Sequence, residues 1–179
     1  DGHSKNPYKE SDPTSPMGVY GKTKQLGEQA IQHSSLNAII LRTSWVYSTF
    51  GNNFVKTMLR LGQEKNEINV VNDQFGSPTY ARDIALACLS ILNQINNWEN
   101  GVSIYNYSNK GVISWYDFAT EIMKLANIDC KVNPISSDKF PTKAKRPKFS
   151  VLDKAKIKNT FNIEVPYWRD SLMECLKNK

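Results

Sequence analysis

The stretch VYGKTKQLGEQAIQH, residues 19–33, predicts an amphipathic helix, and the run AIIL at 38–41 behind it predicts a buried parallel strand. Leu26, Ala30 and Ile31 supply the apolar stripe of this helix. Further strands are expected at 68–71, 103–107 and 131–135, and further helices at 54–63, 83–95, 115–126, 154–160 and 168–176. Strands that alternate with helices predict an α/β fold.

Tyr20 and Lys24 stand four residues apart at the start of the first predicted helix. Side chains at i and i+4 leave the same helical face, so we expect the phenol and the ammonium side by side. A nearby ammonium favours the phenolate, which suits Tyr20 to proton transfer beside a hydride carrier. The same spacing also arises by chance in many helices, where it means only a solvated lysine near a tyrosine.

The composition allows a hydrophobic core and restricts the possible partners. The chain has 179 residues, a hydrophobic fraction of 40%, a formal net charge of +6 and a pI of about 9.2. A positive balance suits an anionic partner such as a nucleotide sugar, and it is also common on ordinary protein surfaces. No run of five or six like charges occurs, and no aromatic ladder accompanies the basic segment 139–148. We therefore expect no nucleic-acid partner.

Cysteine and histidine usage predicts neither a disulfide framework nor a metal site. Cys88, Cys130 and Cys175 lie far apart in the sequence and are odd in number. We therefore expect free thiols in a reducing compartment. His3 and His33 lie outside any ligand motif, so no metal ligand is assigned. No signal peptide or membrane span is evident, which predicts a cytoplasmic protein without a membrane partner.

The Gly-rich loops that hold phosphates in nucleotide-binding folds are absent from this sequence. Neither G-x-G-x-x-G nor G-x-x-x-x-G-K-[ST] occurs, and the chain begins Asp1-Gly2-His3. If Tyr20 and Lys24 act beside a nicotinamide, we expect the part that holds its pyrophosphate to be missing.

Seven further segments carry a resemblance that extends over nearly the whole chain, in order. They are PYKESDP at 7–13, VYGKTKQLGE at 19–28, LRTSWVY at 41–47, NFVKTMLR at 53–60, VNDQFGSPT at 71–79, Arg146-Pro147 and YWRDSL at 167–172. They resemble the dTDP-4-dehydrorhamnose reductase family, a branch of the extended short-chain dehydrogenases/reductases. The Tyr-x-x-x-Lys pair is common to the superfamily, whereas RTSWVY and DQFGSPT are much more specific to these reductases.

The resemblance implies an NADPH- or NADH-dependent reduction of the C4 keto group of dTDP-4-dehydro-L-rhamnose, which yields dTDP-L-rhamnose for bacterial surface polysaccharides. Tyr20 would be the acid/base at the C4 oxygen, and Lys24 would hold the nicotinamide ribose and favour the ionised form of Tyr20. The cofactor carries the hydride. Some members of the family are dimers with an interfacial magnesium ion, for which we assign no site; a homodimer is one expectation.

Four residues are candidate substrate contacts. Trp45 matches the family's sugar-contacting tryptophan, and an indole there offers a flat apolar wall to a deoxysugar. Asn52 and Asn53 precede a helix whose N-terminal amides can face the diphosphate; simple capping is the equal alternative. Arg146 can clamp the diphosphate bidentately, or it is a solvated loop arginine.

Two further expectations concern the neighbouring segments. Residues 77–79 are expected to shape the pocket wall. Asp83, just ahead of a predicted helix, is expected to be its N-cap rather than a catalytic group.

The expected organisation is the C-terminal part of a Rossmann-type fold. Residues 1–50 and 80–112 would complete the cofactor-binding sheet, and residues 51–79 and 113–179 would form the sugar-nucleotide lobe. Such a piece is expected to be inactive alone and to expose an apolar face where the absent strands would dock. The alternatives are a non-catalytic relative, like the regulatory subunit of methionine adenosyltransferase, and another sugar-nucleotide epimerase or reductase.

Overall fold

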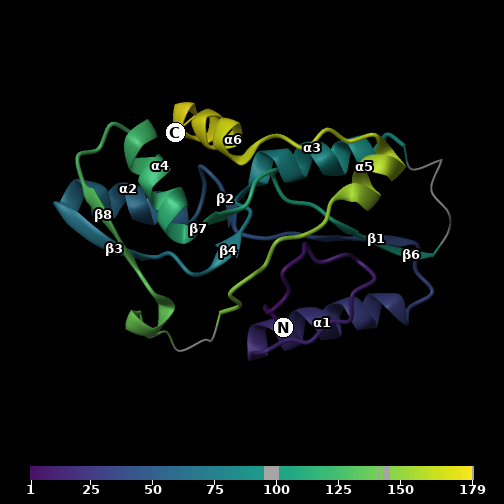
Figure 1. The fold of residues 1–179 in the computed structure, drawn as a ribbon. Helices are drawn as coiled ribbons and strands as arrows, with labels where there is room; N and C mark the ends of the chain where they lie inside the picture. Colours follow the sequence, from purple (N-terminus) through teal and green to yellow (C-terminus); the bar gives the residue numbers. More distant parts are fainter. Residues whose placement is uncertain (95–100, 141, 143–145, 179) are drawn as a thin grey trace.

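Residues 1–94, 101–140, 142 and 146–178 are described by the computed structural model (Figure 1). Its elements in chain order are α1 (Val19–Gln32), β1 (Ala38–Arg42), β2 (Val46–Tyr47), α2 (Phe54–Glu64), β3 (Glu67–Val71), β4 (Phe75–Gly76), β5 (Thr79–Tyr80), α3 (Ala81–Leu92), β6 (Val102–Asn106), β7 (Ile113–Ser114), α4 (Trp115–Leu125), β8 (Lys131–Ile135), the 3-10 turn η2 (Ser137–Lys139), α5 (Ala155–Phe161) and α6 (Trp168–Lys177). Every helix and strand expected from the sequence is present, with bounds shifted by at most three residues. The expected end of α3 at residue 95 lies outside the described residues.

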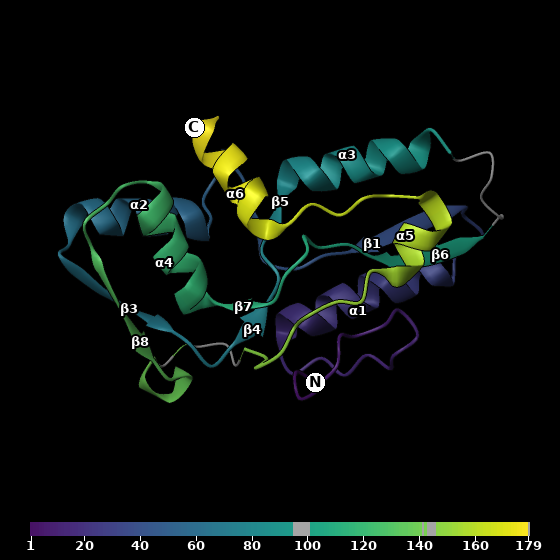
Figure 2. The same cartoon turned by 45° about the horizontal axis from the view of Figure 1, so that its top comes forward.

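One half of the molecule is built on the parallel pair β1–β6. Ala38 pairs with Val102 and Arg42 with Asn106, so the two strands run in register along their whole length. Helix α1 lies on one face of this pair, and α3 and α5 lie on the other (Figures 1 and 2). The core between β6, α3 and α5 contains Ala87, Ile91, Tyr105, Tyr107, Ile157, Phe161 and Ile163.

The other half is built on a second parallel pair, β3–β8, in which Ile68 pairs with Val132 and Val70 with Pro134. Helices α2 and α4 pack on this pair and on each other, and α6 packs on α4 (Figure 1). The buried face of α2 is Val55, Met58, Leu59 and Gly62, which repeats at helical spacing. Ser114 caps α4 with a full capping box, its hydroxyl accepting from the Asp117 amide and the Asp117 carboxylate accepting from the Ser114 amide.

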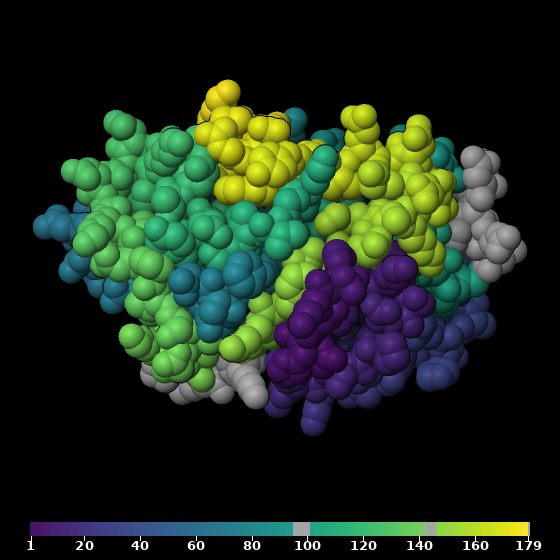
Figure 3. All heavy atoms as spheres, viewed as in Figure 1, coloured from purple at the N-terminus to yellow at the C-terminus, as the bar shows by residue number. Residues whose placement is uncertain are grey.

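Short strand pairs join the two halves. The segment 72–80 contains β4 and β5, which pair with β7 and β2 respectively. The N-terminal segment also crosses between distant parts of the chain, because the Tyr8 amide donates to the Val151 carbonyl at 2.8 Å. Figure 3 shows this N-terminal segment lying against the segment that leads into α5.

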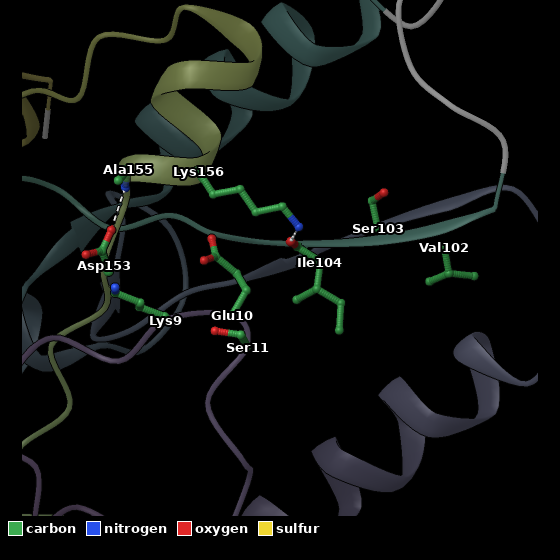
Figure 4. A pocket seen from close by; sticks show the side chains of 9 residues that line it. All are labelled: Lys9, Glu10, Ser11, Val102, Ser103, Ile104, Asp153, Ala155 and Lys156. Atoms are coloured by element: carbon green, nitrogen blue, oxygen red, sulfur yellow. Dashed lines mark hydrogen bonds between the residues drawn. The ribbon is translucent and has the colours of Figure 1, made fainter.

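The outer edge of β6 is occupied by side chains rather than by another strand in the described part of the chain. Lys156 Nζ donates to the Ile104 carbonyl at 2.8 Å, and the Asn106 amide donates to Glu10 Oε1 at 2.8 Å (Figure 4). A cavity of about 610 Å³ lies here, open to solvent between residues 9–11, β6 and the start of α5. Polar side chains therefore satisfy the backbone groups of an edge strand.

Large apolar side chains lie exposed on the outer faces of α1 and α3. They are Val19 and Leu26 on α1, and Leu86, Leu89 and Leu92 on α3. Helix α1 has no buried residue at all. Exposed apolar side chains thus lie on helices on both sides of the β1–β6 pair. That an apolar face marks where absent strands would dock stays a prediction.

Candidate active site

Tyr20 and Lys24 lie on one exposed face of α1, near its N-terminus. The side chain of Lys24 reaches over the ring of Tyr20, with Nζ 5.5 Å from the ring centroid. Tyr20 is 76% exposed, so its hydroxyl is accessible to a bound molecule. The expected pairing of phenol and ammonium on one helical face is present.

Helix α1 is held to the sheet by a bidentate ion pair. Arg42, the last residue of β1, donates from Nε and Nη2 to the Glu28 carboxylate at 2.6 to 3.1 Å. This contact connects the helix that carries Tyr20 and Lys24 to the carboxyl end of β1, which is where ligands bind in open α/β sheets.

A larger cavity, of about 1080 Å³, opens on the opposite side of the short strand pairs from β1–β6. Apolar side chains of α2, β3 and α4 form one wall: Phe54, Met58, Leu61, Ile68, Val70 and Trp115. Polar and charged side chains lie around it: His3, Lys65, Asp138, Thr142, Arg146 and Lys148. Met17, three residues before Tyr20, also lines this cavity. Neither Tyr20 nor Lys24 is among the residues that line either cavity, so the structure does not bring this pair together with the cavity-lining residues.

Trp45 lies one ring behind the cavity wall rather than in it. Its indole stacks on Trp115 with ring centroids 3.5 Å apart and planes 8° from parallel. Trp115 lines the cavity, and Phe54 packs against it at 4.6 Å between centroids. The backbone at Trp45 is left-handed, with φ of 48°. An aromatic wall one to two rings deep thus bounds the pocket.

Of the remaining predicted substrate contacts, Arg146 lines the larger cavity and Asn53 caps helix α2. Arg146 lines the cavity from the loop after η2. Asn53 is the N-cap of α2, as expected, because its Oδ1 accepts from the Lys56 amide at 3.1 Å. Its Nδ2 donates to the Ser48 carbonyl at 2.7 Å. Asn52 is exposed in the turn before it, and neither asparagine is among the cavity-lining residues.

The expectation that residues 77–79 shape the pocket wall is wrong. Ser77 and Thr79 are fully buried and do not line either cavity. The Ser77 hydroxyl donates to the Gly111 carbonyl at 2.6 Å, and Ser44 donates to the Ser77 carbonyl at 3.0 Å. These residues instead hold the short strands together.

Asp83 is also not the N-cap that the sequence suggested. The N-cap of α3 is Tyr80, and Asp83 lies inside the first turn, 5% exposed. Its Oδ2 accepts from Asn109 Nδ2 at 2.6 Å and from the Ser171 hydroxyl at 2.5 Å. Asn109 Oδ1 in turn accepts from the Tyr80 amide at 2.8 Å. The carboxylate thus joins α3, the loop after β6 and α6 in a buried polar network.

Burial removes two other tyrosines from consideration as proton donors. It raises the pKa of Tyr47 and of Tyr107 far above the usual range, so both phenols stay protonated. Both are about 1% exposed. Tyr20, by contrast, lies open to solvent.

The described residues show no grouping of three or more His, Cys, Asp or Glu side chains that could hold a metal ion. Among the same residues, no helix combines the length and apolar character that crossing a bilayer requires.

Comparison with known proteins agrees with this arrangement. The chain is 42% identical to dTDP-4-dehydrorhamnose reductase of Aggregatibacter actinomycetemcomitans over 96% of this chain and 61% of that protein. It is 39% identical to the spore coat polysaccharide biosynthesis protein SpsK of Bacillus subtilis, over 99% of this chain and 60% of that protein. The crystal structure of dTDP-4-dehydrorhamnose reductase from Bacillus anthracis in complex with NADP superposes with a TM-score of 0.93, at 35% identity, over 99% of this chain and 62% of that one.

The chain therefore spans about 60% of the length of these relatives. Its α/β architecture is that of the matching part of Rossmann-type reductases. The RmlD substrate binding domain family matches residues 1–179, which is the whole chain. This chain belongs to the RmlD substrate binding domain family.

Proposed function

We propose that this chain is the substrate-binding part of an NAD(P)H-dependent reductase that converts the C4 keto group of dTDP-4-dehydro-L-rhamnose to the alcohol of dTDP-L-rhamnose. The observation that carries the proposal is the exposed Tyr20–Lys24 pair on α1, in a molecule that also holds a separate cavity of about 1080 Å³ lined by Met17 from the segment before α1. Relatives named for this activity, at 38 to 42% identity, support it.

Tyr20 and Lys24 have separate proposed roles. Reduction of a ketone needs a proton at the carbonyl oxygen as the hydride arrives at carbon, and the Tyr20 hydroxyl is the donor. The ammonium of Lys24 lies over the same ring, 5.5 Å from its centroid, and is placed to hold the ribose of the cofactor beside the donor. A nicotinamide cofactor supplies the hydride when bound.

The residues present fit one end of such a cofactor. A hydroxyl and an ammonium exposed on one helix face suit the hydroxyl groups of a ribose. The chain carries no Gly-rich turn for a pyrophosphate. We accordingly propose that residues 1–50 and 80–112 complete a cofactor-binding sheet whose phosphate loop belongs to the part of the relatives that this chain does not span.

The larger cavity is the proposed sugar-nucleotide site, lined mainly by the proposed lobe of residues 51–79 and 113–179, with His3 and Met17 contributed by the N-terminal segment. Arg146 and Lys148 bring positive charge to a diphosphate, and the apolar wall around Phe54 and Trp115 suits the nucleoside and the deoxysugar. Asn52, Asn53 and Trp45 stay proposed contacts; the Asn53 side chain already caps α2, so its contribution would come through the amides of that helix. A cytoplasmic location, a homodimer and a magnesium ion stay predictions from the resemblance.

The binding half of the proposal is tested on the chain itself. Calorimetric titrations with dTDP-L-rhamnose, a UDP-sugar and a GDP-sugar are expected to show binding of the dTDP-sugar, weakened roughly tenfold or more by Arg146→Ala because a charge-assisted contact is lost. Lys5→Ala, an exposed lysine outside the cavity, is the matched control. Equal affinity for all three nucleotides, or an unchanged affinity in Arg146→Ala, would contradict the assignment.

The catalytic half is tested on a hybrid in which the cofactor-binding part of the A. actinomycetemcomitans reductase precedes this chain. Tyr20→Phe is expected to lower kcat by about 10²–10⁴-fold, since the proton donor is lost. Lys22→Met serves as control for Lys24→Met, because both are exposed lysines of α1 and only Lys24 lies over the Tyr20 ring. The chain alone is expected to oxidise no NADPH. Robust NADPH oxidation by the chain alone would refute the proposal that cofactor binding needs the part of the relatives that this chain does not span.

A further inference from the structure

Gly76 approaches the indole of Trp45 more closely than any other residue type permits. A Cβ at this position would lie 2.5 Å from Trp45 Cε2 and 2.7 Å from Cζ2 and Nε1. Real Cβ atoms essentially never come within 3.0 Å of another heavy atom. Gly76 is not among the glycines with positive φ, so its backbone conformation is open to any residue. Close approach to Trp45, and not backbone freedom, is what requires glycine here.

The Trp45 ring is confined by Trp115 as well. The two indoles stack at 3.5 Å with planes 8° apart. Trp45 meets both neighbours from a left-handed backbone, φ 48°, a conformation that costs a bulky residue free energy and persists only when the surroundings enforce it. The carbonyl of Trp45 accepts from the Thr79 amide at 3.1 Å, which holds that backbone in place.

The three segments that meet at Trp45 are connected by strand pairing. Gly76 pairs with Ile113 in β4–β7, and the next residue of β7, Ser114, caps α4, which begins at Trp115. Val46 pairs with Thr79 in β2–β5. Strand pairing therefore joins the segment that carries Gly76 to the segments that carry Trp45 and Trp115.

We propose that Gly76 is a positioning residue for sugar recognition. By carrying no side chain, it lets the Trp45 indole lie flat on Trp115, and this fixes the orientation of the aromatic wall at the cavity. Gly76 itself does not line the cavity, so it acts through Trp45. The inference rests on the proposed function, in which this wall receives the deoxysugar. A methyl group at position 76 displaces the indole and weakens the preference for a sugar nucleotide over the bare nucleotide.

The packing part of the proposal is tested without a ligand, by thermal unfolding of a double-mutant cycle. Gly76→Ala is expected to lower Tm by roughly 5 °C, because the added methyl group overpacks the site against the Trp45 ring. In a Trp45→Leu background the same change is expected to leave Tm within about 1 °C, since the clashing indole is gone. Gly27→Ala, a glycine of α1 with open space around it, is the control and should not lower Tm. Equal losses in both backgrounds would overturn the proposal.

The recognition part is tested by titrating the chain with dTDP-L-rhamnose and with dTDP. Wild type is expected to prefer the sugar nucleotide, and Gly76→Ala is expected to reduce that preference by about fivefold or more while its affinity for dTDP is unchanged. A merely structural defect would weaken both ligands alike. If the preference is intact in Gly76→Ala, the positioning role is wrong and the proposed function stands; if wild type shows no preference, both fail. Trp45→Phe, which keeps a ring, should restore part of the preference to Gly76→Ala.

Discussion

Removal of the Asp83 carboxylate is expected to destabilise the whole fold. Asp83 Oδ2 accepts two short hydrogen bonds, from Asn109 at 2.6 Å and Ser171 at 2.5 Å, and the group is 5% exposed. Hydrogen bonds to a charged group contribute about 1.5–3 kcal/mol each, and buried partners left unsatisfied add to the loss. Asp83→Ala is therefore expected to cost about 3–5 kcal/mol, out of roughly 5–15 kcal/mol for a typical domain.

The assay is urea unfolding followed by circular dichroism, with thermal unfolding as a second measure. A loss of this size should lower Tm by roughly 6–20 °C for a chain of this length, at about 2–4 °C per kcal/mol. Asp83→Asn keeps one acceptor oxygen and should cost about half as much. Asp129→Ala removes an exposed carboxylate and should stay within about 0.5 kcal/mol of wild type.

The hydrogen bonds of Asp83 connect parts of the chain that are far apart in sequence, so a double mutant offers a second test. Asp83→Ala and Ser171→Ala should be strongly non-additive, because both remove the same 2.5 Å contact. If Asp83→Ala unfolds within about 1 kcal/mol of Asp129→Ala, or if the two losses add in full, the stabilising role assigned to this carboxylate is wrong.

Three further perturbations test separate features. Tyr47→Phe should stabilise the fold by about 1 kcal/mol at pH 7, because the buried hydroxyl has no hydrogen-bond partner among the described residues. Burial raises the pKa of Tyr47, so above about pH 10 the phenol ionises more readily in the unfolded state than in the folded state and stability falls; urea unfolding should show a smaller alkaline loss in Tyr47→Phe. Glu28→Gln, which breaks the bidentate pair with Arg42, should speed amide hydrogen exchange in α1 and leave β6 unchanged; equal protection of α1 would contradict this. Asn127→Ala should lose about 1 kcal/mol in thermal unfolding and Asn127→Gly almost none, because the backbone there is left-handed, φ 53°.

Local signals in the sequence were sufficient for the helices and the longer strands. The Ser114 capping box and the spacing of apolar residues on α2 act within one or two turns, so they could be recognised without knowing the fold. The two-residue strands β4 and β5 could not, because their hydrogen bonds lie with distant partners and two residues carry no alternation. Asp83 shows the same limit: its position suggested a cap, and its real partners, Asn109 and Ser171, are brought to it only by tertiary packing.

The site was predictable in its residue types and only partly in its geometry. The spacing of Tyr20 and Lys24 gave their shared helical face directly. The stack of Trp45 on Trp115 joins residues 70 positions apart, and a left-handed tryptophan has no sequence signal of its own.

The side chains on β6 have a consequence for assembly. Lys156 and Glu10 take up two outward backbone groups of β6, the Ile104 carbonyl and the Asn106 amide. A strand pairing along this margin would have to displace both side chains, and charged side chains placed at a sheet edge in this way disfavour pairing with another chain. Recruitment of a further strand to the β1–β6 pair is therefore expected along β1 rather than along β6.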